Sequence, residues 1–143
     1  MTSFVLHLRR GLMACAVLSL SSLSLAQPAV QLPPMRGEGA ARYLCGGIGL
    51  DESTAFRAAM KDHPLALLFA RADGAYVAEV RVRIEGTDGR PVLALRAGGP
   101  VCLIDLPAGR YVVHAEAEGE MKQQSVTVGT GNKTADFRFG GKG

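Results

Sequence analysis

The chain has 143 residues, with 16 lysines and arginines against 13 aspartates and glutamates. A net charge of only +3, without a basic run or face, argues against a nucleic-acid partner. This length fits one domain with one hydrophobic core, and the absence of tryptophan disfavours a surface that stacks on sugars.

Residues 1–26 have the three parts of a bacterial secretory signal peptide. Arg9 and Arg10 supply the positive charge, an apolar run follows, and Ser24-Leu25-Ala26 is a small-x-small cleavage site. The apolar run is shorter than the roughly 20 residues of a transmembrane helix, and no stop-transfer flank follows it. We therefore expect cleavage near Ala26-Gln27, a periplasmic or secreted protein, and no stable membrane insertion after cleavage.

The cysteines agree with export. Cys15 lies in the predicted signal peptide, so Cys45 and Cys102 remain in the mature chain. Two cysteines in an oxidising compartment most often form a disulfide. In the chain-entropy model, closing so long a loop stabilises the fold by roughly 4 kcal/mol. Two free or buried thiols are the alternative.

Residues 27–42 are rich in proline and glycine and have no apolar periodicity, which predicts a flexible N-terminal segment. Order is expected to begin near Tyr43, so that residues 43–143 form the folded domain. The glycine-rich residues 46–49 lack a preceding strong strand and the lysine of a phosphate-binding loop, so they predict a turn that leads into a helix.

A helix is predicted over residues 51–63 and ends before Pro64. Asp51 or Ser53 is expected to cap its free amides. Helical spacing predicts one buried stripe, and hence packing against the side or end of a sheet; the stripe consists of Ala55, Phe56, Ala59, Met60 and His63.

The remaining chain reads as short strands separated by turns. The strand at 76–85 alternates, which predicts one buried and one solvent-exposed face. The buried face is expected to carry Tyr76, Ala78, Val80, Val82 and Ile84, and the exposed face Glu79, Arg81, Arg83 and Glu85. Seven strands are predicted, over residues 65–71, 76–85, 91–97, 101–106, 110–118, 121–128 and 134–139.

The clearest hairpin joins the strands at 110–118 and 121–128. A two-residue Gly119-Glu120 loop would place Val113 opposite Val126 and His114 opposite Ser125. An all-β, seven-stranded antiparallel β-sandwich of immunoglobulin-like type, preceded by one short α-helix, is favoured. A small barrel is the alternative, because periodicity does not separate the two.

A segment at the centre of this region resembles a known family. Leu106-Pro107-x-Gly109-x-Tyr111, followed by Gly119 and a strand ending Val126-Thr127-Val128, is similar to the carboxypeptidase regulatory-like domain, a transthyretin-like (prealbumin-like) seven-stranded sandwich. The similarity covers about residues 76–139. Gly46-Gly47-Ile48-Gly49-Leu50-Asp51-Glu52, with the helix that follows, resembles the leader of small exported proteobacterial proteins that carry such a domain and have no assigned function, so that the mature chain is covered almost throughout.

The resemblance implies a fold rather than an activity. In it Pro107 fixes the turn, Gly109 allows a φ that other residues avoid, and Tyr111 is a large buried ring with a polar tip. The zinc peptidase domain of carboxypeptidases has no counterpart here. The Tyr-Arg-Gly-Ser ending of transthyretin-like hydrolases is replaced by Phe137-Arg138-Phe139-Gly140.

No catalytic motif is present, and neither catalytic nor cofactor-binding residues nor a cofactor are predicted. His63, at the end of the predicted helix, is expected to be structural. His114 and Glu116 lie two apart on one strand face, so they are weak candidates for a metal site. Their expected neighbours, Ser125 and Gln123, are poor ligands, and a solvated polar face is the alternative.

The sequence therefore predicts an exported, non-catalytic module that contacts another envelope or periplasmic protein through a sheet edge or loops. A metal-binding or small-ligand-binding protein that uses the outward face of residues 110–118 is one alternative. A purely structural domain is another.

Overall fold

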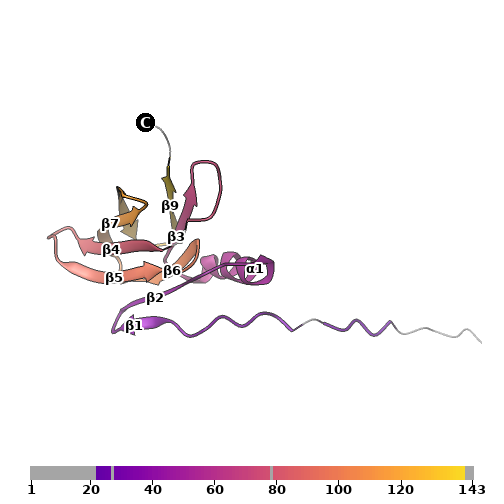
Figure 1. The fold of residues 1–143 in the computed structure, drawn as a ribbon. Coiled ribbons are helices and arrows are strands. Elements are labelled where there is room, and N and C mark those ends of the chain that lie inside the picture. The colour runs from indigo at the N-terminus through magenta and orange to yellow at the C-terminus, as the bar shows by residue number, and fades with distance from the viewer. Residues whose placement is uncertain (1–21, 27, 78, 141–143) are drawn as a thin grey trace, which may run out of the picture.

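The computed structural model describes residues 22–26, 28–77 and 79–140 of the chain. Within these residues, nine strands form two sheets, and one short α-helix lies beside them (Figure 1). Most of the predicted signal peptide, together with Gln27 at its expected cleavage site, lies outside the described residues. Export and cleavage therefore stay predictions.

The two sheets have five and four strands. The first has the order β1-β2-β6-β3-β9, with bounds Arg36–Glu38, Ala41–Gly46, Val101–Asp105, Leu65–Arg71 and Lys133–Phe139. The second has the order β5-β4-β7-β8, with bounds Pro91–Ala97, Val80–Gly86, Gly109–Ala117 and Glu120–Val128. Two separate sheets around a buried core correspond to the predicted β-sandwich rather than to a barrel.

The prediction of seven strands is wrong, because the chain before the helix adds two strands, β1 inside the segment expected to be flexible and β2, which begins at its end and continues to Gly46. The glycines there make specific turns rather than a loose chain: Gly37 has a φ of 105° and Gly39 a φ of 62°. Arg36 pairs with Tyr43 across this hairpin, and β2 then pairs with β6. Order therefore begins before Tyr43, and glycine content alone misled the prediction.

The expectation of a wholly antiparallel sandwich is also wrong, because β3 and β9 are parallel, from Leu65 opposite Lys133 to Arg71 opposite Phe139. Residues 129–132 carry the chain from β8 in one sheet to β9 in the other. A connection between sheets does not impose the antiparallel direction that a hairpin imposes.

Strand β4 begins at Val80, four residues later than predicted. Glu79 has a φ of 60°, which ends the extended conformation, and the alternation reverses before it, with Val77 buried and Tyr76 45% exposed. From Val80 to Glu85 the buried and exposed faces of the strand are as predicted.

The β7–β8 hairpin turns one residue earlier than predicted, which shifts its register by two. Its loop is Glu118-Gly119, with φ values of 51° and 77°, so Val113 lies opposite Gln124 and His114 opposite Gln123. Two positive φ values are those of a type I′ turn, whose twist matches that of the paired strands. Because side chains alternate with a period of two, each residue keeps its predicted face.

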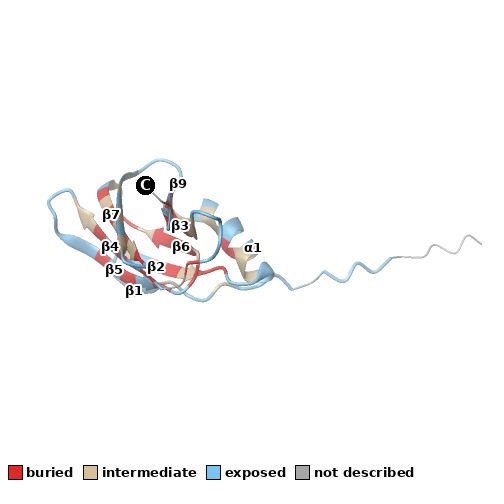
Figure 2. Ribbon diagram, turned by 45° about the horizontal axis from the view of Figure 1, so that its top comes forward, coloured by how far each residue is buried: buried red, intermediate tan, exposed pale blue. Residues whose placement is uncertain are grey.

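The core lies between the sheets, where the inward-facing side chains of both are buried (Figure 2). Ala135, Phe137 and Phe139 of β9 point inward as predicted, and the Phe137 ring stacks on Phe69 at a centroid distance of 5.8 Å.

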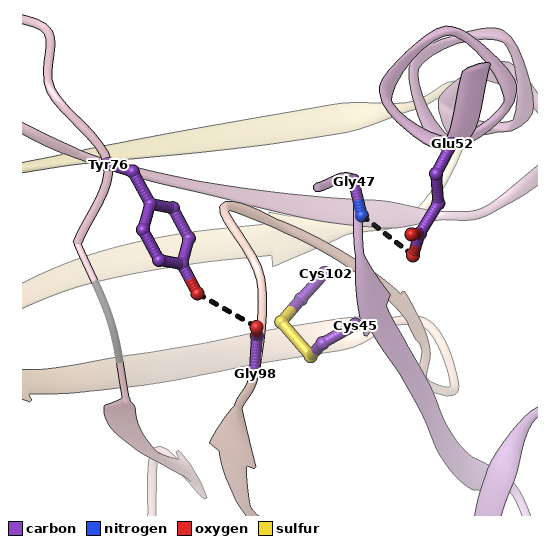
Figure 3. Close-up of a disulfide and its surroundings, with 6 residues drawn as sticks. All are labelled: Cys45, Gly47, Glu52, Tyr76, Gly98 and Cys102. Carbon is purple, nitrogen blue, oxygen red and sulfur yellow. Dashed lines mark hydrogen bonds between the residues drawn. A yellow bond between two sulfur atoms is a disulfide. The ribbon is translucent and has the colours of Figure 1, made fainter. Parts of the chain in front are cut away.

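The predicted disulfide between Cys45 and Cys102 is present, and the free-thiol alternative is wrong. The two cysteines lie directly opposite each other on β2 and β6, so the bond links neighbouring strands of the five-stranded sheet (Figure 3). Cys102 is fully buried. The bond therefore ties the N-terminal hairpin to the centre of the fold.

The predicted helix is confirmed as α1, Leu50–Ala59, continued by a 3₁₀ turn, Met60–Asp62. Phe56 is its buried residue and packs on Leu44, Val101 and Leu103, on the outer face of the five-stranded sheet. This face of the sheet is opposite to the main core, so the helix closes a second, smaller apolar cluster.

The capping prediction is wrong. The N-cap is Gly49, with a φ of 82° and no side-chain hydrogen bond to the helix. Glu52 instead accepts a hydrogen bond of 3.1 Å from the Gly47 amide (Figure 3), which holds the turn that leads into the helix.

Candidate functional site

The outward face of the four-stranded sheet carries the polar residues singled out from the sequence. The register of β4 and β7 places Arg81 opposite Glu116 and Arg83 opposite His114. Arg81 Nη2 lies 2.9 Å from Glu116 Oε1. The predicted candidate Glu116 is therefore held in an ion pair across the strands.

His114 has a different partner. Its Nε2 lies 3.2 Å from Glu85 Oε2, and the other carboxylate oxygen of Glu85 lies 2.7 Å from Arg83 Nη1. The side chains of His114 and Glu85 are both more than four-fifths buried. Glu85 thus links a histidine and an arginine on one half-buried polar face.

His114 and Glu116 lie on one face of the sheet, as predicted, but each contacts a different partner: His114 contacts Glu85, and Glu116 contacts Arg81. Within the residues described, no group of three or more histidine, cysteine, aspartate or glutamate side chains is arranged to hold a metal ion. A zinc site uses at least three protein ligands. Met121 and Gln123, which face Glu116 and His114 across β8, do not complete one.

Sequence reasoning put Glu85 on a wet face but missed that it lies beside His114. The two residues are 29 apart in sequence, and β5 and β6 come between their strands along the chain. Only the pairing of β4 with β7 brings them together. A small cavity of about 200 Å³ opens next to this pair, lined by Arg81, Val82, Arg83, His114, Glu116 and Met121.

His63 has the structural position that was predicted. Its Nδ1 lies 2.7 Å from Asp105 Oδ1, at the end of β6. Its carbonyl oxygen accepts a hydrogen bond from Asn132, which also binds the Lys61 carbonyl. These contacts fasten the end of the helix to β6 and to the loop before β9.

The residues that carry the family resemblance form a compact turn. The Tyr111 hydroxyl donates a hydrogen bond of 2.6 Å to the Pro107 carbonyl, and Leu106 is buried beside it. Gly109 is not at positive φ, so that part of the prediction is wrong. A Cβ at Gly109 would lie 3.5 Å from the Tyr111 hydroxyl, an ordinary van der Waals distance, so packing does not require glycine there either.

A second surface, which the sequence did not single out, lies along α1. Val30, Ile48 and Leu50 are large apolar side chains that are 47%, 57% and 83% exposed. They border two open cavities between the N-terminal segment and the helix, of about 480 and 750 Å³. We call this surface, lined by residues 28–33, 48–52, 54–55, 58–59 and 61–62, the helix groove.

The helix groove depends on contacts that a proline-rich segment does not reveal. Leu32 and Met35 pack on the apolar cluster under α1, which holds residues 28–35 against the helix. The sequence feature that could have pointed to this surface is the pair Ile48 and Leu50. These two apolar residues flank Gly49 and lie outside the predicted buried stripe of the helix, so they could have been expected to be exposed.

The sequence matches no protein-family model and no curated protein. Among the described residues, no helix is long and apolar enough to cross a membrane.

Proposed function

We propose that the mature chain is an exported, non-catalytic β-sandwich module that binds another protein of the bacterial envelope. The observation that carries this proposal is the group of exposed apolar side chains in the helix groove. Val30 and Ile48 lie beside a cavity of about 480 Å³ that is rimmed by the carboxylates of Asp51 and Glu52. Contiguous exposed apolar surface with a polar rim is typical of protein-interaction sites.

Two features support the export part of the proposal. The first 26 residues have the pattern of a cleavable signal peptide. The Cys45–Cys102 bond is of the kind that persists in an oxidising compartment, such as the periplasm. Cleavage after Ala26 would make Gln27 the first residue of the mature protein, and Pro28, which follows it in the sequence, lines the helix groove.

We also propose membership in the transthyretin-like group with carboxypeptidase regulatory-like domains. The turn from Leu106 to Tyr111 supports it, because the tyrosine hydroxyl closes that turn by its bond to Pro107. The two-sheet architecture supports it at the level of fold class. The hairpin of β1 and β2 and the helix α1 would then be additions on the N-terminal side of that domain.

The proposed contact can be tested by photo-crosslinking in the periplasm. A benzophenone amino acid at position 48 should form an adduct with one envelope protein, because Ile48 is 57% exposed and reports on the cavity it borders. The matched control carries the same group at position 121, since Met121 is 66% exposed on the opposite side of the sandwich. The adduct should be absent from the control.

An Ile48→Ser variant should lose co-purification of the same partner without loss of thermal stability, because the side chain is exposed. If no adduct forms from position 48 in cells that export the chain, the protein-binding proposal is wrong. A domain without a partner, acting as a structural element, would then be the better account.

A second candidate function uses the outward face of the four-stranded sheet. The observation that favours it is the cavity of about 200 Å³ where Arg83, His114 and Glu116 come together. Calorimetric titration with Zn²⁺ and Cu²⁺ tests it, with His114→Ala as the matched variant. Saturable heat that the variant loses would support a metal or ligand site, and its absence in the natural chain would remove it.

A further inference from the structure

Leu50 is the first residue of α1 and is 83% exposed, which is unusual for a leucine in a folded domain. It borders the larger cavity of the helix groove, of about 750 Å³. The lining of this cavity includes Pro28 and Ala29 of the N-terminal segment and the small side chains of Ala58 and Ala59, followed by Lys61 and Asp62 in the 3₁₀ turn. The cavity thus combines an exposed leucine in the first turn of the helix with small apolar side chains in its last turn.

The charges of the groove are also arranged from end to end. Asp51 lines it in the first turn of α1, and Lys61 lines it in the 3₁₀ turn that follows the helix. Neither side chain is in an ion pair with any residue in 22–26, 28–77 or 79–140. The middle of the face carries Thr54 and Ala58, whose small size allows a second helix to approach closely.

This surface is complementary to itself under two-fold symmetry. If two copies of α1 lie antiparallel about an axis beside the middle of the helix, Asp51 of each copy faces Lys61 of the other. Thr54 then faces Ala58 of the second copy. Leu50 then lies beside the last turn of the second helix, where Ala58 and Ala59 offer small apolar side chains. One symmetry operation thus accounts for the exposed leucine and for both unpaired charges.

From this self-complementarity we propose that the mature protein forms a two-fold dimer through antiparallel packing of α1 in the helix groove. The ten residues of α1 are only about 15 Å long. Such a contact is smaller than the ~800 Å² per partner of a standard stable interface. The dimer should accordingly dissociate on dilution and on addition of salt.

The test is a charge exchange, followed by sedimentation analysis of the mature, disulfide-bonded chain over a range of concentrations. Asp51→Lys and Lys61→Asp should each raise the dimer dissociation constant about tenfold, because each places like charges together twice in the dimer. The double variant D51K/K61D restores opposite charges across the axis and should recover dimerisation. Leu50→Ser should abolish it.

The matched controls are Glu38→Lys and Arg90→Asp, which change exposed charges at the β1–β2 and β4–β5 turns, away from the groove. They should leave the dissociation constant unchanged, and circular dichroism should show every variant folded. A chain that stays monomeric at all concentrations overturns the dimer, and so does a double variant that behaves like either single one. The dimer uses the larger cavity beside α1, which Ile48 does not line, whereas the envelope partner is assigned to the smaller cavity that Ile48 borders. The charge exchange and the crosslink from position 48 therefore test the two proposals separately.

Discussion

Reduction of the Cys45–Cys102 bond should cost the fold about 4 kcal/mol of unfolding free energy. The bond joins residues with a sequence separation of 57. In the chain-entropy model, a closed loop of that length removes about 4 kcal/mol of conformational entropy from the unfolded chain. A domain of this size is stable by only about 5–15 kcal/mol, so the bond supplies a large part of the total.

The native state should change little when the bond is lost. Cys45 and Cys102 are already opposite each other in a ladder of five paired positions between β2 and β6. Backbone hydrogen bonds hold these strands together without the sulfur atoms. The lower stability should therefore come from the unfolded state, whose conformational entropy and exposed surface both increase when the loop opens.

Urea unfolding monitored by circular dichroism measures both consequences. The oxidised chain, the chain reduced with dithiothreitol, and the double variant Cys45→Ala/Cys102→Ala should be compared. The reduced chain and the double variant should have a lower midpoint and a larger m-value than the oxidised chain, because more surface is exposed on unfolding. A loss of less than about 1 kcal/mol, or an unchanged m-value, would refute this reasoning.

Three further predictions concern local packing. Gly99→Ala should destabilise the fold by about 2 kcal/mol or more, because a Cβ there would collide with the main chain of Gly46. Gly98→Ala is the control and should be nearly neutral, because nothing lies within 4 Å of a Cβ at that position. Thermal melts compare the two variants. Phe56→Ala should cost about 3–5 kcal/mol in urea unfolding, because that ring is the buried anchor of α1. Tyr111→Phe should cost about 1 kcal/mol by the same measurement, because it removes one hydrogen bond and leaves the ring in place.

Much of the fold followed from side-chain periodicity and turn chemistry. Strands β3 and β5 have the predicted bounds. The helix begins one residue before its prediction, and its last turn is the 3₁₀ turn Met60–Asp62 rather than α-helix. These elements have strong apolar patterns bounded by Pro64, Gly74 or Gly89, so local sequence determined them. The hairpin of β1 and β2 has no such apolar pattern. It is held by the pairing of β2 with β6 and by the disulfide, and neither contact can be read from the local sequence.

The site was harder to predict than the fold because it depends on which strands become neighbours. The outward position of His114 followed from alternation, whereas its contact with Glu85 required the β4–β7 pairing. The hairpin register depended on Glu118, a glutamate at positive φ, and no composition rule favours that residue there. The helix groove requires the N-terminal segment to lie on α1, which Leu32 and Met35 achieve through long-range contacts.

The distribution of exposed groups favours one face of the sandwich for the proposed binding. The outer face of the four-stranded sheet carries paired charges, such as Arg81 with Glu116, and such pairs are well solvated. The outer face of the five-stranded sheet packs instead against α1, Leu32 and Met35, and Ile48 and Leu50 beside them are exposed. The resemblance to the carboxypeptidase regulatory-like domain covers about residues 76–139, whereas this surface belongs to the segment before β3, in which residues 46–52 resemble the leader of small exported proteobacterial proteins. We therefore propose that the sandwich supplies the scaffold and that the segment before β3 supplies the surface that binds the partner.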